Sequence, residues 1–293
     1  MKIAVFDVGG TYIKYACSDE QGNLSHKGKI KTPQSREAFY DVVEEIINKL
    51  GAVEGLAFSL PGFIDAKQGY ISVGGSLRYH DNCHFVKDME AHMKLPVSIQ
   101  NDAKCAALAQ IWKGNQINEN AVVLVFGTGV GGALIQQGQL YDGSHFMAME
   151  LSCIIQGDIA TQGLQATLGN RFSIPNLMDR IAEKLHLEHI EGEKAFQLLR
   201  EGNEVVKAEM LAYSRTLALQ LFNFQCCFDP DIFYIGGGIS AQPAFISLIQ
   251  QAVDGLLEKI PFALPPIQVK QMCHQADANL IGAVYQYLRN HEA

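Results

Sequence analysis

A strand, a glycine-rich turn and a second strand occur twice in the same order, and this repeat constrains the fold more than any other feature of the sequence. The first copy is Lys2–Phe6, the turn Asp7-Val-Gly-Gly-Thr11 and Tyr12–Cys17. The second copy starts about 120 residues later, with Ala121–Phe126, Gly127-Thr-Gly-Val-Gly-Gly132 and Ala133–Gln136. Short glycine turns between apolar β runs predict antiparallel hairpins. We therefore expect an internal duplication, with one hairpin opening each half of the chain.

Further strands and helices alternate after each hairpin. In the first half we expect the strands Lys27–Thr32, Val53–Ser59 and Val97–Gln100, and helices over Ser35–Leu50 and after Asn101-Asp102. In the second half we expect helical structure over Ile174–Cys227, broken near Gly192 and Gly202, and further helices over Ala244–Leu257 and Asn279–Leu288. The expected strands are Asp231–Ile235 and Ile267–Gln271. Hairpins combined with alternating strands and helices predict an α/β fold with mixed sheets flanked by helices.

The chain length predicts two domains. At about 150 residues per domain, 293 residues suffice for two separate cores. We expect a first domain of residues 1–113 plus 277–293 and a second of residues 114–276, with the junction near Trp112–Gln116.

Composition excludes several classes of partner. Subtracting 23 Lys and Arg from 31 Asp and Glu gives a formal charge of −8. Because no run of Lys or Arg is present, nucleic acid is not an expected partner. No apolar run approaches the roughly 20 residues that span a bilayer, so we expect no membrane partner. Asp7 interrupts the apolar run at the N-terminus, so we expect no export signal and a cytoplasmic location. The seven cysteines include no CxxC pair, which favours a reduced protein without zinc.

The first glycine turn has the composition of a phosphate-binding site. Gly9 and Gly10 allow a tight turn whose N–H groups face an anion, and Thr11 adds a hydroxyl donor. Asp7 can hold Mg²⁺, directly or through water, beside a polyphosphate, and Lys14 completes the pattern Asp-x-Gly-Gly-Thr-x-x-Lys. A plain hairpin turn is the alternative interpretation.

The second turn repeats this chemistry at Gly127, Thr128, Gly129 and Gly131. Two such turns in equivalent positions favour nucleotide binding, and if they faced each other they would hold the β- and γ-phosphates from opposite sides. Neither turn is a P-loop, because the Gly-Lys-Ser/Thr ending is absent, and strand rather than helix follows each.

Two further sites have both a structural and a functional interpretation. Asn101-Asp102 stands between a strand and a helix, where both residue types serve as caps. Asp102 at such a position can also act as the general base that accepts a hydroxyl proton during phosphoryl transfer. Gly236, Gly237 and Gly238 follow a buried strand. They form either a tight turn or a surface without side chains on which a ring or ribose can lie.

Taken together, these motifs resemble the ROK family of sugar kinases within the actin/hexokinase/Hsp70 ATPase superfamily. The resemblance extends over essentially the whole chain and includes Pro61-Gly62 with Asp65. It implies two actin-like, ribonuclease H-like domains with a ligand cleft between them, ATP and Mg²⁺ as cofactors, and a homodimer. By resemblance Asp102 is the catalytic base, Asn101 and Gly75 contact the sugar, the two turns hold the ATP phosphates, and Gly236–Gly238 lie beside the adenosine.

The sequence departs from the family pattern at the sugar end of the site. Family kinases usually have Glu-x-Gly-His after the second turn, and here Glu150 is retained while Cys153 takes the place of the His. The family's cysteine-rich zinc motif has no counterpart in 156–168, and Gln165 stands where a sugar-binding Glu is expected. We therefore expect no structural zinc, and a substrate that differs from glucose near C1 and C2, such as a β-glucoside, another disaccharide or N-acetylmannosamine.

Three functions follow from this resemblance. The first is ATP-dependent phosphorylation of a primary hydroxyl, O6, of a hexose or β-glucoside. The second is a sugar-sensing regulator. The family's regulators have an N-terminal helix-turn-helix, and we expect none here because the phosphate-binding strand begins at Lys2. The third is a sugar-binding protein without catalytic activity.

Overall fold

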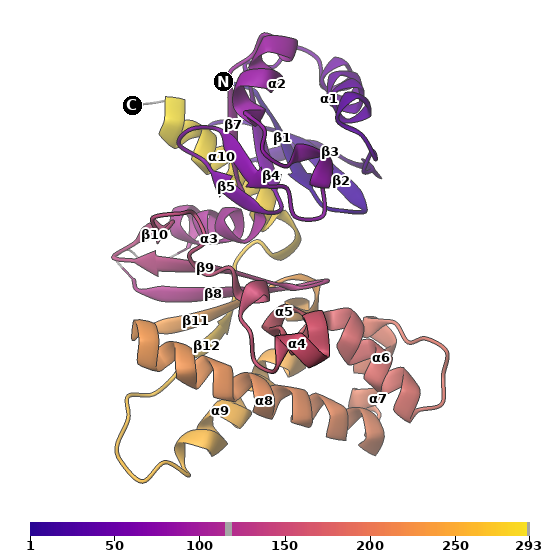
Figure 1. Ribbon diagram of the computed structural model, residues 1–293, viewed down its shortest axis with the longest axis vertical. Coiled ribbons are helices and arrows are strands. Elements are labelled where there is room, and N and C mark those ends of the chain that lie inside the picture. Colours follow the sequence, from indigo (N-terminus) through magenta and orange to yellow (C-terminus); the bar gives the residue numbers. More distant parts are fainter. Residues whose placement is uncertain (115–118, 292–293) are drawn as a thin grey trace. The chain divides into compact units, whose positions relative to one another are not determined.

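A computed structural model describes residues 1–114 and 119–291, which form two compact units (Figure 1). Unit 1 comprises described residues 1–114, 142–148 and 276–291, and unit 2 comprises 119–141 and 149–275. The division expected from the sequence assigned 142–148 to the second domain, whereas their contacts group them with unit 1. The expected junction near Trp112–Gln116 extends into residues 115–118, which lie outside the described residues.

Unit 1 is a five-stranded mixed sheet with helices on both faces. The strand order is β3-β2-β1-β4-β7, with β2 antiparallel to both neighbours and β1, β4 and β7 parallel. The elements are β1 (Ile3–Val8), β2 (Tyr12–Ser18), β3 (Leu24–Lys31), α1 (Arg36–Leu50), β4 (Gly55–Leu60), a small hairpin of β5 (Phe63–Asp65) and β6 (Tyr70–Val73), α2 (Phe85–Met93), β7 (Val97–Asn101), α3 (Asp102–Lys113) and α10 (Ala278–His291).

The helices of unit 1 begin and end where the sequence indicates. Ser35 is the N-cap of α1, because its side chain accepts a hydrogen bond from the Ala38 N–H, and Gly51 at φ 78° ends the helix. Asn101 caps α3 in the same way by accepting from the Lys104 N–H. These caps fix the point at which the chain leaves each strand, and so they determine where the polar residues at the strand ends lie.

Strand alternation gives the unit 1 sheet two different buried faces. Ala4, Phe6 and Val8 of β1 point to the core shared with α1 and α2, where Phe6 stacks on Phe58 at 4.7 Å. Ile3 and Val5 point to the opposite core, which contains Cys105 of α3 and Leu280 and Val284 of α10. Asp7 has the same parity as Ile3 and Val5, so its side chain lies on the face covered by α3 and α10.

Unit 2 repeats the architecture. Its sheet has the order β10-β9-β8-β11-β12, with β9 antiparallel to both neighbours and β8, β11 and β12 parallel. The elements are β8 (Ala121–Phe126), β9 (Val130–Gln136), β10 (Gln139–Tyr141), α4 (Ile159–Gln162), α5 (Leu168–Arg171), α6 (Ile174–Lys184), α7 (Gly192–Arg200), α8 (Glu204–Phe228), β11 (Ile232–Gly236), α9 (Pro243–Leu257) and β12 (Val269–Gln271). The long helix α8 and its neighbour α9 are the orange helices of Figure 1.

The two sheets match strand for strand in order and in direction, which confirms the duplication inferred from the hairpins. They correspond as β1 to β8, β2 to β9, β3 to β10, β4 to β11 and β7 to β12. The mixed α/β fold class is confirmed, whereas several expected boundaries shift by up to three residues. The third strand, for example, begins at Leu24 rather than Lys27.

Within residues 1–114 and 119–291, no helix combines the length and the apolar character that crossing a membrane requires.

Candidate functional site

The candidate residues of unit 1 gather at the carboxyl edge of its three parallel strands. Asp7 is near the end of β1, Pro61-Gly62 follows β4, and Asn101 and Asp102 join β7 to α3. Carboxyl ends of parallel strands meet at one edge of an α/β sheet, where ligands bind because the loops leave the strands there. The fold therefore brings together residues that are nearly 100 positions apart in the sequence.

Asp7 is held in place by three side chains. Its Oδ1 accepts hydrogen bonds from Ser59 Oγ at 3.2 Å and from Asn279 Nδ2 at 2.9 Å, and Lys14 Nζ lies 3.4 Å from Oδ2. Ser59 has the parity that faces α3 and α10, and Asn279 is in the first turn of α10. No motif in the sequence points to either residue. A polar residue within the apolar strand Gly55–Leu60 was the one sequence signal for Ser59.

The first glycine turn is exposed and tightly closed. The Gly9 N–H donates to the Tyr12 carbonyl at 2.9 Å, and Thr32 Oγ1 donates to the Gly9 carbonyl at 2.6 Å. A Cβ on Gly10 would lie 2.9 Å from the Ser76 side chain, so this turn approaches the loop that contains Gly75. Thr11 and Lys14 are exposed beside the turn, as a phosphate-binding hairpin requires.

Gly75 and Asn101 meet at the Pro61-Gly62 turn. Asn101 Nδ2 donates to the Gly62 carbonyl at 3.0 Å while its Oδ1 caps α3. A Cβ on Gly62, where φ is 105°, would lie 1.9 Å from the Val73 carbonyl oxygen, so only glycine fits there. Gly75 is exposed at φ 59°, and a Cβ there would lie 3.1 Å from Pro61. Asp65 is three residues after Gly62 and caps its own turn by accepting from the Lys67 and Gln68 N–H groups.

Asp102 is a partly exposed carboxylate in surroundings that disfavour its charge. It is the first residue of α3, and its Oδ1 accepts from the Ala103 N–H at 2.8 Å. Burial, joined by the nearby charge of Asp7, raises the pKa of Asp102 to about 6 against the opposing hydrogen bond from the Ala103 N–H. A carboxylate with this pKa is ionised at neutral pH and is basic enough to accept a proton.

The second glycine turn is at the corresponding corner of unit 2. The Gly127 N–H donates to the Gly129 carbonyl at 3.0 Å, and the space where a Gly127 Cβ would lie is empty to beyond 4 Å. Thr128 is exposed beside it, and Gly131 is in β9 opposite Val125. In the duplicated fold Val125 and Gly131 stand where unit 1 has Asp7 and Lys14. Unit 2 therefore repeats the backbone of the turn without its charged pair.

The three consecutive glycines lie against this second turn. Gly237, at φ 88°, packs so closely on the end of β8 that a Cβ would lie 2.0 Å from the Phe126 carbonyl oxygen. Gly236 is paired with Val125 in the sheet, and Gly238 faces open space. The structure thus places Gly236–Gly238 beside Gly127, along one backbone surface that lacks side chains.

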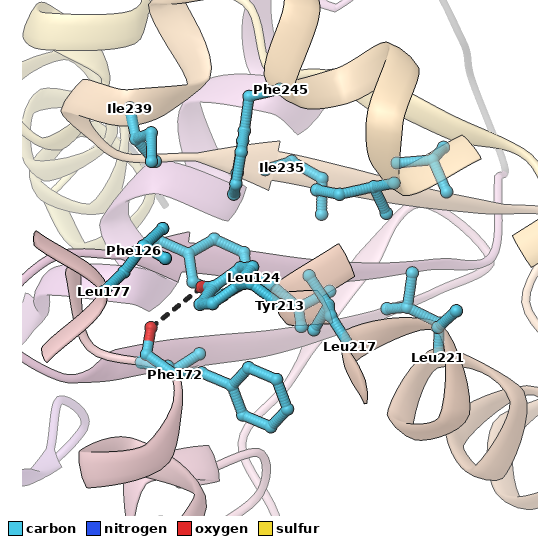
Figure 2. Packing of buried hydrophobic residues seen from close by; sticks show 14 of the residues in the cluster. Leu124, Phe126, Phe172, Leu177, Tyr213, Leu217, Leu221, Ile235, Ile239 and Phe245 are labelled. Atoms are coloured by element: carbon cyan, nitrogen blue, oxygen red, sulfur yellow. Dashed lines mark hydrogen bonds between the residues drawn. The ribbon is translucent and has the colours of Figure 1, made fainter. Parts of the chain in front are cut away.

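An apolar core fixes both glycine segments of unit 2 (Figure 2). Phe126, directly before Gly127, and Ile239, directly after Gly238, are buried in one cluster with Tyr213, Phe172 and Phe245. Tyr213 Oη donates to the Phe172 carbonyl at 2.9 Å, which is the dashed line in Figure 2. A rigid core immediately below the two turns orients their backbone N–H groups in advance.

Glu150 and Gln165 lie in the segment that follows the second turn, both in unit 2. Ser152 joins this segment to the turn, because its Oγ accepts from the Val130 N–H at 2.9 Å and donates to the Val130 carbonyl at 3.0 Å. Cys153 is exposed next to Ser152, and Gln165 is exposed in a 3₁₀ turn, Gly163–Ala166. No motif in the sequence points to Ser152, although it is next to Cys153, which takes the place of the family His.

Within the described residues, no group of three or more His, Cys, Asp or Glu side chains is arranged to hold a metal ion. Asp7 is the carboxylate beside the first glycine turn, and all seven cysteines are free.

Comparison with known proteins finds relatives that match almost the whole chain. A β-glucoside kinase from Klebsiella pneumoniae is 32% identical over 98% of this chain and 96% of its own length, and one from Listeria monocytogenes is 31% identical over 99% and 98%. The crystal structure of a ROK family protein from Streptococcus pneumoniae TIGR4 in complex with sucrose superposes with a TM-score of 0.87 at 29% identity, covering 100% of this chain and 99% of that one. The ROK family model matches residues 3–289, and the chain belongs to the ROK family.

Proposed function

We propose that this protein is an ATP-dependent sugar kinase that phosphorylates the primary 6-hydroxyl of a hexose or β-glucoside, with Asp102 as the general base. The observation that carries this proposal is the position of Asp102. Its carboxylate, with a pKa of about 6, lies at the same sheet edge as the glycine turn that begins at Gly9. Kinship with β-glucoside kinases supports the sugar class.

The residues present fit ATP and Mg²⁺. Backbone surfaces at Gly127 and Gly238 have room that a Cβ would occupy, and exposed N–H groups of glycine turns suit polyphosphate. Asp7 would hold Mg²⁺, directly or through water, and the ion would neutralise charge on the transferred phosphoryl group. Gly9, Gly10, Thr11 and Lys14 in unit 1, with the Gly127–Gly131 turn in unit 2, would bind the phosphates.

In this mechanism Asp102 removes the proton from the sugar O6 as that oxygen forms its bond to the γ-phosphorus and ADP departs. The proton moves to the Asp102 carboxylate, and the backbone N–H groups of the turns stabilise the spreading negative charge. Asn101 uses one Nδ2 proton on Gly62, and the second is available for a sugar hydroxyl. Gly75, Glu150 and Gln165 would contact the rest of the sugar.

A screen of sugar-dependent ADP release tests the proposal. The acceptors are glucose, N-acetylmannosamine, cellobiose, gentiobiose and sucrose, together with 6-deoxyglucose, which lacks the attacking hydroxyl. We expect turnover with at least one acceptor, greatest for a β-glucoside, and none with 6-deoxyglucose.

Asp102→Asn should abolish this turnover, whereas Asp41→Asn, an exposed carboxylate on α1, should leave it unchanged. Sugar binding measured by calorimetry without turnover on any acceptor would show a binding or regulatory protein instead. Turnover on 6-deoxyglucose would refute the choice of hydroxyl alone.

A further inference from the structure

The side chain of Lys104 is completely buried, although it belongs to the helix that starts with Asp102. Its exposed fraction is 0%, and residues 103–110 of α3 are buried around the whole circumference of the helix. A lysine is rarely buried without partners, because removing its charge from water is costly. The ammonium of Lys104 must therefore be compensated within unit 1.

Three oxygens from a single short segment supply that compensation. Lys104 Nζ lies 3.1 Å from the Phe146 carbonyl oxygen, 3.5 Å from the Asp142 carbonyl oxygen and 3.3 Å from Asp142 Oδ1. The two carbonyl oxygens accept hydrogen bonds from the ammonium, and the Asp142 carboxylate adds an ion pair. The segment closes around it, because the Ala148 N–H donates to the Asp142 carbonyl at 3.4 Å.

None of residues 142–148 belongs to the buried core. Every residue in the segment is partly or fully exposed, and the relative solvent-exposed area of Met147 is 48%. Gly143 and Phe146 adopt positive φ values of 76° and 59°, which is an unfavourable backbone for Phe146. A polar anchor, rather than an apolar core, therefore holds this segment in unit 1.

The segment leads directly to a residue of the proposed sugar site. Residues 142–148 belong to unit 1, while the chain on either side of them belongs to unit 2. Glu150 comes two residues after Ala148, so its Cα can be at most about 7 Å from that of Ala148. Anchoring the segment on α3 thus restricts where Glu150 can lie.

We infer that Lys104 is a positioning residue for the sugar site: its buried ammonium fixes the segment 142–148 on α3, and so couples the helix of the general base to the chain that carries Glu150. This inference rests on the proposed kinase function. It assigns no chemical step to Lys104, which acts only through the segment that it holds.

Lys104→Met tests this, because it keeps the length of the side chain but removes the charge. We expect the KM for the sugar to rise about tenfold or more, with the KM for ATP and kcat changed by less than about threefold. The rise of kcat/KM with pH that reports the ionisation of Asp102 should keep the same apparent pKa in this variant. Lys104 is not among the groups that set the pKa of Asp102. Hydrogen exchange should accelerate in 142–148 and remain unchanged in β8 and β9.

Two further variants complete the test. Asp142→Asn removes the carboxylate charge but leaves both carbonyl oxygens in place, so it should give a smaller rise in the KM for the sugar. It replaces Lys104→Met as the test variant if that protein does not fold. Lys87→Met, at an exposed position on α2, is the control and should behave as wild type.

The inference would be overturned if Lys104→Met left both the KM for the sugar and the hydrogen exchange of 142–148 unchanged. It would also be overturned if the variant lowered kcat while the KM values for sugar and ATP stayed the same. If the wild type phosphorylates no sugar, the proposed function fails. The exchange experiment and sugar binding by calorimetry then still decide the role of Lys104.

Discussion

The chemistry of Asp102 depends on two neighbours, its own helix and Asp7. Burial and the charge of Asp7 raise the pKa of Asp102, while the Ala103 N–H opposes them. Asp7 is itself kept in position by Ser59 and Asn279. The sequence predicts both carboxylates as candidates from their places after strands. It does not predict their interaction, because that requires the parallel pairing of β1, β4 and β7.

The pH dependence of activity should report the ionisation of Asp102. The base is active only when deprotonated, so kcat/KM should rise with pH through an apparent pKa of about 6 and level off above it. Because the charge of Asp7 contributes to the raised pKa, residual activity of Asp7→Asn should show this limb at lower pH. Steady-state kinetics from pH 4.5 to 8.5 measure both profiles, and a limb that does not move in Asp7→Asn would contradict the coupling.

Asp102 should also lower the stability of the fold at neutral pH. Its pKa is about 6 in the folded state against 3.8 in the reference state, so the folded state binds the proton more tightly. Stability from this group is present at low pH and is lost as pH rises from about 4 to 6. Asp102→Asn should therefore be more stable than wild type at pH 8, by about 1–3 kcal/mol, and the difference should shrink toward pH 4. Urea unfolding at the two pH values measures it; a less stable variant at pH 8 would contradict the account.

At the scale of elements, the site depends on the close crossing of α3 and α10. A Cβ on Gly282 of α10 would lie 1.7 Å from the Cys105 carbonyl oxygen of α3, so the two helices meet backbone to backbone there. The N-terminal turns of the same helices carry Asp102 and Asn279. Most helices and strands were predictable from periodicity and caps. This crossing was not, because a single glycine in a helix gives no signal of what lies against it.

Gly282→Ala should push α3 and α10 apart. We expect a loss of about 1–3 kcal/mol in unfolding free energy from overpacking, together with reduced kcat as Asp102 and Asn279 shift. Gly255→Ala in α9, where nothing lies within 4 Å of the new Cβ, is the matched control. It should be neutral or stabilising by up to about 1 kcal/mol, because alanine favours helix. Equal stability of the two variants by thermal unfolding would show that the crossing tolerates a methyl group.

Substituting Gly237 and Gly238, which follow β11, should have different effects: one on the stability of unit 2 and the other on nucleotide binding. Gly237→Ala would clash with the Phe126 carbonyl and place alanine at φ 88°, so it should destabilise unit 2 by at least 1–2 kcal/mol. Gly238→Ala meets no protein atom within 4 Å. It should leave the melting temperature unchanged and raise the KM for ATP by occupying the surface proposed for the nucleoside. Unchanged ATP KM in Gly238→Ala would remove that glycine from the nucleotide site.

For the whole molecule, the sequence predicts the duplication but not all of its consequences. Two glycine hairpins were enough to predict two similar halves, and the matching strand orders confirm them. The asymmetry between the halves is chemical: Val125 and Gly131 replace the Asp7 and Lys14 pair in the second hairpin. That 142–148 belong to unit 1 could not be predicted, because their anchor, Lys104, looks in sequence like a polar position on a helix.

Dependence on metal should be catalytic and not structural. Asp7 is the proposed metal ligand beside the first glycine turn, so the ion is expected to act together with the bound phosphates. Dialysis against EDTA should abolish sugar-dependent ADP release and leave the melting temperature unchanged, and Mg²⁺ should restore activity. A fall in melting temperature reversed by Zn²⁺ would instead reveal a structural zinc site.

The most direct test of the account is ADP formation by wild type and Asp102→Asn with the preferred sugar, with sugar affinity measured on the same preparations. We predict that the variant binds the sugar with an affinity within about threefold of wild type and loses at least about 100-fold in kcat, since general bases contribute factors of this size or larger. A variant that retains kcat within a few-fold of wild type would contradict the assignment of Asp102 as the base.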